Sequence, residues 1–190
     1  MPPRGHGDSG QVFPIYITVV AGLLFLAFAF FAVGQAAVNR NSAQTAADAA
    51  ALAAAQETRD ELADLWVLAV LDPTKWQSIF DGYGGSNACD RAMQLAAMND
   101  ATAQCSPDGR LGYRVRAEAN KPIGESVVPG TAGRHAHADA VAVIEPLCQP
   151  TDDVLPTLTC DDGDDWVLDP DDLTELPGPE DLFHVHLVSG

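Results

Sequence analysis

The stretch of sequence that decides the fold is VFPIYITVVAGLLFLAFAFFAV, residues 12–33. It contains no charged side chain. As an α-helix it extends about 33 Å, enough to cross a hydrocarbon core about 30 Å thick. Pro14 lies at the start of the stretch, where a missing backbone N–H costs a helix least. A chain of 190 residues has too little other apolar sequence to bury such a helix. Residues 12–33 therefore predict a single transmembrane helix, preceded by a cytoplasmic leader, residues 1–11.

A cleaved signal peptide is the alternative interpretation of this stretch. The apolar core of a signal peptide normally has about 7–15 residues, followed by small residues at the cleavage site. Gly34-Gln35-Ala36 offers such small residues. The greater length of residues 12–33 and the helical sequence that follows them favour a retained anchor.

Charge and cysteine content indicate on which side of the membrane the domain lies. The net charge of −17 argues against nucleic acid or an anionic lipid surface as the main partner, and all ten Lys and Arg residues lie at or before Arg134. Four cysteines follow the apolar stretch: Cys89, Cys105, Cys148 and Cys160. An even number of cysteines beyond a membrane segment predicts two disulfides in an oxidising compartment. We therefore expect a cytoplasmic N-terminus and an extracytoplasmic C-terminal domain.

Residues 34–72 are predicted to continue the anchor as an alanine-rich helix. No Gly or Pro occurs in residues 35–72, and eleven of the twenty residues in 36–55 are alanine, the strongest helix former. Polar side chains at Asn41, Gln44, Thr45 and Asp48 give way to residues 49–55, which are apolar on every face. Because such a helix is normally buried, we expect it to pack against its own domain, other helices, or both. This expected interaction helix comprises Ala46, Ala47, Asp48, Ala49, Ala50, Ala51, Leu52, Ala53, Ala54 and Ala55.

A family resemblance follows from the order of these segments. A Gly-containing polar leader and an apolar span precede Ala43-Gln44-Thr45-Ala46-Ala47-Asp48-Ala49-Ala50-Ala51-Leu52-Ala53-Ala54-Ala55. This order resembles the TadE/TadG-like proteins of bacterial Tad (Flp) pilus-assembly systems, closely from about Asp8 to Gln56 and more weakly to about Cys148. The resemblance implies a non-enzymatic structural or assembly protein of the bacterial cell membrane. It also implies that the alanine-rich helix contacts other pilus-assembly or pilin-like proteins, or further copies of the chain.

The resemblance further bears on processing at the N-terminus. Cleaved members of the pilin group have Gly at the cut and Glu five residues beyond it. Here Gly10 is followed at that distance by Ile15. We therefore expect an uncleaved, anchored accessory protein and not a subunit of the pilus shaft.

The residues beyond the long helix predict a small α+β domain over residues 73–150. A helix is expected over residues 88–101, with Ser86 and Asn87 as N-cap candidates. Residues 111–118 and 136–145 alternate in polarity and predict half-buried strands, and residues 183–188 could form a third. A helix and antiparallel strands packed on a long N-terminal helix form a pilin-like α+β fold. Residues 151–190 are expected to be an acidic, largely solvated tail.

The expected helix and strands also predict how the cysteines pair. If residues 88–101 are one helix, Cys89 and Cys105 lie about 20 Å apart, whereas bridged Cα atoms lie within about 7 Å. Antiparallel strands with Glu118 opposite His135 would place Cys105 opposite Cys148. We therefore expect the disulfides Cys105–Cys148 and Cys89–Cys160.

Two groups of side chains are candidate metal ligands. His135 with His137, and His184 with His186, would each project from one face of a strand, and four imidazoles suit Zn²⁺ or Cu²⁺. In the tail, the run 161–165 and the run 169–172 are rich in Asp, but neither fits the EF-hand spacing that would indicate a calcium site. Polar faces that happen to contain His, and a plain acidic surface, are the simpler interpretations of the two groups.

Three classes of function remain in contention. The first is the assembly protein that the resemblance implies. The second is an anchored extracytoplasmic module that binds Ca²⁺, Zn²⁺ or a cationic partner through the acidic tail or the His pairs. The third is an enzyme, but no nucleophile elbow, phosphate loop or HExxH motif occurs. The sequence therefore predicts no catalytic residue and no cofactor.

Overall fold

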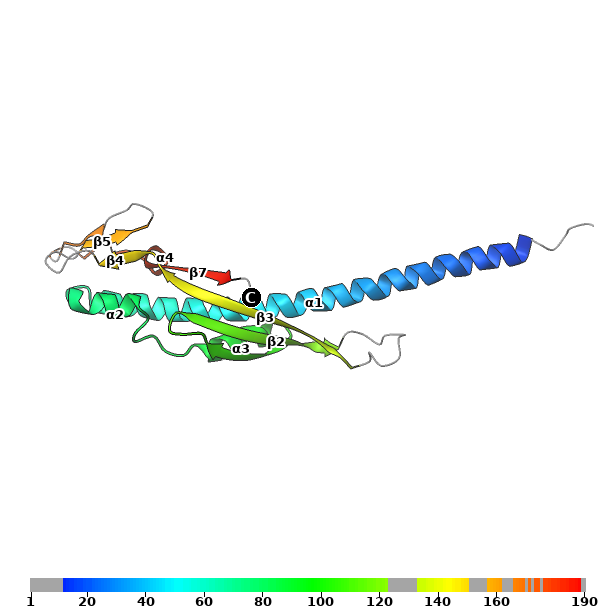
Figure 1. The fold of residues 1–190 in the computed structure, drawn as a ribbon, viewed down its shortest axis with the longest axis horizontal. Helices are drawn as coiled ribbons and strands as arrows, with labels where there is room; N and C mark the ends of the chain where they lie inside the picture. Colours follow the sequence, from blue (N-terminus) through cyan, green and yellow to red (C-terminus); the bar gives the residue numbers. More distant parts are fainter. Residues whose placement is uncertain are drawn as a thin grey trace, which may run out of the picture.

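The computed structural model describes residues 12–122, 133–150, 157–161, 166–169, 171, 173–174 and 176–188. Its elements are α1 (Val12–Leu68), the 3₁₀ helix η1 (Pro73–Lys75), α2 (Trp76–Phe80), α3 (Cys89–Met98), β1 (Ala101–Pro107), β2 (Gly112–Pro122), β3 (His135–Pro146), β4 (Cys148–Pro150), β5 (Thr157–Cys160), β6 (Trp166–Val167), α4 (Pro179–Leu182) and β7 (Phe183–Val188). Helices combined with antiparallel sheets confirm the predicted α+β class. Figure 1 shows α1 as the long axis of the molecule, with the other elements gathered along its C-terminal half.

The N-terminal part of α1 is a candidate membrane span. Phe13–Gly34 has a mean hydropathy of 2.5, and none of it is buried inside the protein. Its large apolar side chains are exposed to the surroundings, and Phe30, for example, is 80% exposed. Water would be a poor solvent for this surface, whereas lipid tails would match it. The length and composition therefore agree with the transmembrane helix predicted at residues 12–33.

α1 ends at Leu68, a few residues before the predicted end at Asp72. The chain then turns, and Pro73 begins η1 because the residue before a proline is disfavoured in the α conformation. The indole N–H of Trp76 donates to the carbonyl of Ala69 at 2.9 Å, and its ring lies 5.6 Å from that of Trp66. The turn therefore folds back onto the last part of α1.

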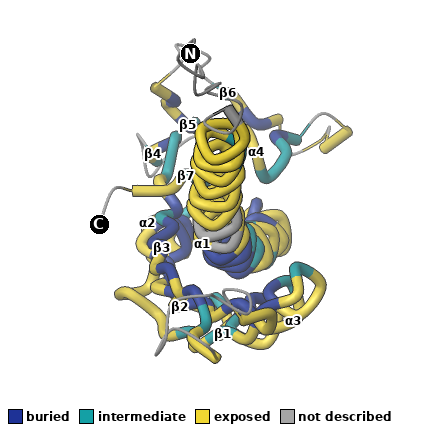
Figure 2. The backbone as a smooth tube through the Cα atoms, turned by 90° about the vertical axis from the view of Figure 1, so that its right-hand side faces the viewer, coloured by how far each residue is buried: buried dark blue, intermediate teal, exposed yellow. Residues whose placement is uncertain are grey.

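A four-stranded antiparallel sheet, in the order β1-β2-β3-β7, packs against the C-terminal half of α1. The strands of the sheet face α1 mainly with small residues: β2 contributes Ala117 and Ala119, and β3 contributes Ala138, Ala140 and Ala142, all buried. Because the side of α1 that meets them is also alanine-rich, helix and sheet approach closely. α3 lies beside α1, and the buried side of α1 faces the sheet and α3 (Figure 2).

The predicted helix over residues 88–101 is too long. α3 ends at Met98, and Asp100 adopts a left-handed conformation with φ of 55°, which Asp tolerates better than most residues. The chain therefore reverses, and Ala101 begins β1, a strand that the sequence did not predict. Its hydrogen-bonded partner is β2, with Ala101 opposite Ala119.

The predicted disulfide pairing is wrong, and this reversal is the reason. β1 runs back along α3, which brings Cys105 to Cys89 with their Cα atoms 5.4 Å apart and joined as a disulfide. The second disulfide joins Cys148 to Cys160, which lie opposite each other in β4 and β5. Neither Cys105–Cys148 nor Cys89–Cys160 forms.

The two strands predicted from alternating polarity are confirmed, in a register that differs by two residues. β2 and β3 pair with Glu118 opposite His137, not opposite His135. A bulge between Glu118 and Pro122 then places Pro122 opposite His135. The extra residues of a bulge cannot be read from alternation alone.

The predicted final strand at residues 183–188 is β7, which pairs with β3. Where it is described, the segment expected to be a solvated acidic tail belongs to the fold. β5 pairs with β4 and β6, Leu158 and Phe183 are fully buried, and the rings of Phe80 and Phe183 lie 5.3 Å apart. A segment that buries large apolar side chains is part of the core, whatever its net charge. Residues 162–165, 170 and 172, which carry most of the two Asp runs, lie outside the described residues.

Candidate protein-interaction surface

The alanine-rich part of α1 is mostly used inside the protein. Six residues of the expected interaction helix, namely Ala46, Ala47, Ala50, Ala51, Ala54 and Ala55, are fully buried against the sheet and α3. The remaining four, Asp48, Ala49, Leu52 and Ala53, are half-buried. The alanine block therefore packs against its own domain first, and only its outer side is left for another protein. Contact of that outer side with a partner stays a prediction.

A buried cluster of hydroxyl groups fixes α1 relative to the sheet. Thr58 of α1 is buried, and its Oγ1 lies 2.7 Å from the hydroxyl of Tyr113 in β2. The Tyr113 hydroxyl also accepts from the N–H of Ala88 at 3.0 Å and donates to the carbonyl of Ser86 at 3.1 Å. The carboxylate of Glu61 accepts from both the N–H and the hydroxyl of Ser86. These bonds join α1, β2 and the start of α3, so the surfaces beside α1 have a defined shape.

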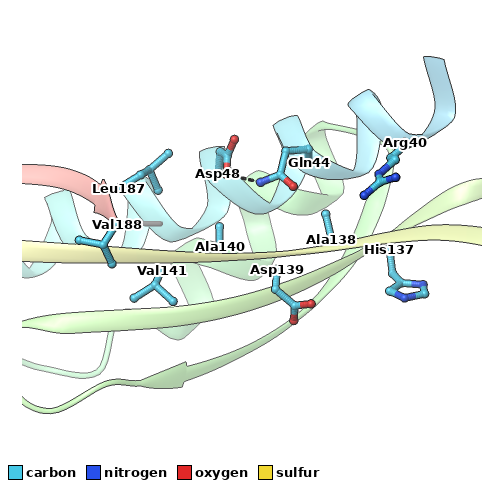
Figure 3. A pocket seen from close by; sticks show the side chains of 10 residues that line it. All are labelled: Arg40, Gln44, Asp48, His137, Ala138, Asp139, Ala140, Val141, Leu187 and Val188. Atoms are coloured by element: carbon cyan, nitrogen blue, oxygen red, sulfur yellow. Dashed lines mark hydrogen bonds between the residues drawn. The ribbon is translucent and has the colours of Figure 1, made fainter. Parts of the chain in front are cut away.

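An open groove of about 530 Å³ lies between α1 and β3, at the end of β7. Its lining residues are Arg40, Gln44, Asp48, His137, Ala138, Asp139, Ala140, Val141, Leu187 and Val188. Figure 3 shows Arg40, Gln44 and Asp48 along α1, facing the strand that carries Ala138 and Ala140. The side chains of Ala138 and Ala140 point toward α1, and those of His137 and Asp139 point away from it. The groove therefore has a helical wall of polar side chains and a floor formed by β3.

β3 forms this floor because it is longer than its neighbour β7. β3 has 12 residues, whereas β7 has six and pairs with β3 only from Val141 to Pro146. The residues of β3 from His135 to Ala140 pair with β2 on one side and, among the described residues, with no strand on the other. The groove thus runs along an open edge of the sheet.

The structure does not bring the two His pairs together. His135 and His137 lie at the start of β3, whereas His184 and His186 lie opposite Glu145 and Val143, near its end. Eight residues along the strand separate His137 from Glu145, a distance of about 26 Å. The rings of His184 and His186 stack 5.2 Å apart. The described residues contain no group of three or more His, Cys, Asp or Glu side chains placed to hold a metal ion.

Comparison with known proteins gives a family match for the segment of α1 that forms the helical wall of the groove. Residues 10–57 match the family model of putative Flp pilus-assembly TadE/G-like proteins. This TadE/G-like segment is about a quarter of the chain and confirms the resemblance seen in the sequence. It covers the candidate membrane span and most of the alanine-rich helix, including Arg40, Gln44 and Asp48. No curated protein and no solved structure matches this chain.

The sequence did not predict the groove. Gln44 and Asp48 were visible as polar residues before the alanine run, but nothing in the sequence showed that β3 lies beside them. The useful signal was the difference in length between the strand predicted at residues 136–145 and the shorter one at residues 183–188. A long strand beside a short one at the edge of a sheet leaves part of its edge open.

Proposed function

We propose that the protein is a membrane-anchored, non-enzymatic assembly component of a Tad (Flp) pilus or a related secretion system. The observation that supports this most is that the TadE/G-like segment lies almost entirely in one continuous helix. The first part of that helix is apolar and not buried inside the protein, and one side of its last part is buried in the folded domain. A helix of this kind holds a domain at a fixed distance and orientation from a membrane.

The proposed orientation has the N-terminus in the cytoplasm and the domain outside it. Two disulfides, Cys89–Cys105 and Cys148–Cys160, support this orientation because disulfides persist in oxidising compartments. An uncleaved N-terminus is proposed as well, since Ile15 stands where a processed pilin has Glu. Gly10, the candidate cleavage site, lies outside the described residues.

The proposed partners are other membrane proteins of the pilus-assembly system. The surfaces of α1 that remain for them are the outer side of the alanine block, with Ala49 and Ala53, and the groove beside Arg40 and Asp48. Association with a neighbouring helix suits small side chains, because they let the two backbones approach closely.

Affinity purification of the full chain in mild detergent tests the proposal. We expect pilus-assembly membrane proteins to co-purify with the wild type and to be lost with Ala49→Arg/Ala53→Arg. The matched control is Met93→Arg/Ala97→Arg, which adds the same charges to exposed positions of α3. Recovery of no pilus-assembly protein with the wild type would contradict the assembly role. Loss with the control as well would contradict the choice of surface.

N-terminal sequencing of the mature protein tests the anchor separately. We expect the intact leader to be present. A mature chain beginning at residue 11 would identify a processed prepilin, and a chain beginning after residue 33 would identify a cleaved signal peptide.

A further inference from the structure

The open edge of β3 presents backbone hydrogen-bonding groups to the groove. The N–H of Ile144 donates to the carbonyl of Leu111, on the β2 side. Because the backbone groups of successive residues in a strand point to opposite sides, those of His137 and Asp139 point away from β2. Among the described residues no strand pairs with them there, since β7 reaches only as far as Val141. The N–H and C=O groups of His137 and Asp139 therefore face the groove.

The helical wall of the groove carries opposite charges at its two ends. Arg40 and Asp48 flank Gln44, whose amide donates to Asp48 Oδ1 at 2.8 Å. Neither Arg40 nor Asp48 forms an ion pair within the described part of the chain. Residues four apart on a helix are separated by about 6 Å, close to the 6.6 Å between alternate residues of a strand. A strand lying in the groove would therefore present alternate side chains to Arg40, Gln44 and Asp48.

β7 shows how a strand occupies this edge. It runs antiparallel to β3, with Leu187 opposite Ala142 and Val185 opposite Ile144, and it packs against α1. A further strand in line with β7 would run from the Asp48 end of the groove toward the Arg40 end. The antiparallel direction is also the one in which β2 pairs with the other edge of β3.

We propose that this groove binds an extended segment of a partner protein, which adds to β3 as an antiparallel strand with a basic side chain at Asp48 and an acidic side chain at Arg40. The biological meaning of this site rests on the proposed assembly role. The edge supplies main-chain hydrogen bonds, and the charges on α1 supply register and direction. When a peptide adds to the edge of a sheet, main-chain hydrogen bonds generally give affinity and side-chain contacts give specificity.

A second copy of the chain is a poorer occupant of the same edge. β3 lies alongside α1 (Figure 1), so antiparallel pairing of β3 with β3 of another copy would make their α1 helices antiparallel. The two membrane spans would then lie at opposite ends of the pair. Two copies anchored in one membrane have parallel α1 helices and cannot pair in this way.

Two synthetic peptides of equal composition and net charge test the proposal on the full chain in detergent micelles. Acetyl-Thr-Lys-Thr-Thr-Thr-Glu-Thr-amide has the proposed order of charges, and its control exchanges Lys and Glu. The protein variant Arg40→Glu/Asp48→Lys exchanges the charges of the groove without changing the net charge. We expect the wild type to bind the first peptide about tenfold more tightly than the control, and the variant to reverse this preference.

Amide hydrogen exchange on the same samples tests the backbone pairing. We expect the peptide to slow exchange at His137 and Asp139 by about tenfold or more, with Ala138, whose N–H points to β2, as the internal control. Equal affinity for the two peptides, absence of binding, or unchanged exchange at His137 and Asp139 would overturn the proposal. So would self-association that protects these amides without peptide, which would assign the edge to a second copy. These measurements use one purified chain, so their outcome is independent of whether pilus-assembly proteins co-purify.

Discussion

Thr58 Oγ1 and the hydroxyl of Tyr113 lie 2.7 Å apart in the buried contact between α1 and β2. The two residues are 55 positions apart in the chain, so this hydrogen bond connects the helix that carries the candidate membrane span to the sheet. Through Ser86 and Ala88, the same hydroxyl also holds the start of α3. These hydrogen bonds attach the sheet and α3 to the side of α1, so the domain packs along the helix.

Tyr113→Phe removes this hydroxyl and keeps the aromatic ring. We expect the domain to lose about 1–3 kcal/mol of unfolding free energy, because Thr58 Oγ1 and the N–H of Ala88 lose a buried partner. Urea unfolding of the full chain in micelles, followed by the fluorescence of the buried Trp66 and Trp76, measures the change. Tyr83→Phe is the matched control, since Tyr83 is 53% exposed. Equal destabilisation by both changes would contradict a special role for Tyr113.

Removal of the Cys89–Cys105 disulfide by Cys89→Ala/Cys105→Ala destabilises the domain. The disulfide closes a loop with a sequence separation of 16, and cross-links of about this length contribute about 3 kcal/mol by restricting the unfolded chain. Peptide mapping of the wild type under non-reducing conditions checks the pairing, and urea unfolding checks the energy.

The comparison variant is Cys148→Ala/Cys160→Ala, which releases the small sheet at the far end of the domain. We expect it to loosen β4 and β5 with less effect on the environment of Trp66. A peptide linking Cys105 to Cys148 would show that the reversal at Asp100 is wrong.

Ala50→Leu overfills the contact between α1 and the elements packed against it. Ala50 is fully buried where two alanine-rich surfaces meet, so the larger side chain must displace the helix or its neighbours. We expect a loss of about 1–3 kcal/mol in unfolding free energy. Ala97→Leu, at an exposed position of α3, is expected to change it by less than about 0.5 kcal/mol. A neutral Ala50→Leu variant would show that α1 is not closely packed at this position.

Asp72 gives a local dependence on pH. The Thr74 hydroxyl donates to Asp72 Oδ1 at 2.6 Å, and Lys75 Nζ lies 3.0 Å from Oδ2. These contacts, the Thr74 hydrogen bond first, lower the pKa of Asp72 below its usual 3.8. Since the folded state has the lower pKa, the ionised carboxylate stabilises this turn fully above pH 3.8. That contribution is lost as the pH falls through the folded-state value.

An NMR titration of the Asp72 carboxyl measures this pKa directly. We expect Thr74→Ala to raise it toward 3.8, while Thr102→Ala, an exposed change in β1, leaves it where it is. An unchanged pKa in Thr74→Ala would show that the hydrogen bond is not its main cause.

Several features of the fold could be predicted because they depend on neighbours in the sequence. The length and apolar composition of residues 12–33 predict a membrane-spanning helix. The alanine run that follows forms a helix in most contexts. Alternating polarity predicted β2 and β3 within a few residues, because the side chains of a strand face its two sides in turn. The TadE/G-like resemblance depends on the same local segments.

The errors arose where distant residues decide the structure. A single left-handed residue, Asp100, reverses the chain after α3, and this turn determines that Cys105 meets Cys89 and not Cys148. Residues 101–107 do alternate between apolar and polar side chains, but the apolar residues that alternate there are small and only Ala101 is buried. The predicted helix therefore extended over the place where the strand begins.

The sequence by itself determined the candidate membrane span, the long helix, three of the seven strands among the described residues and the resemblance of residues 10–57 to pilus-assembly proteins. Only the tertiary structure decided which cysteines pair, which side of the alanine block is buried, and where an open strand edge lies beside charged residues of α1. The physical reason is the range of the interactions. Helix formation and side-chain alternation act over a few residues. The hydrogen bond of Thr58 with Tyr113, and the groove that Arg40 and His137 both line, exist only after the chain has folded back on itself.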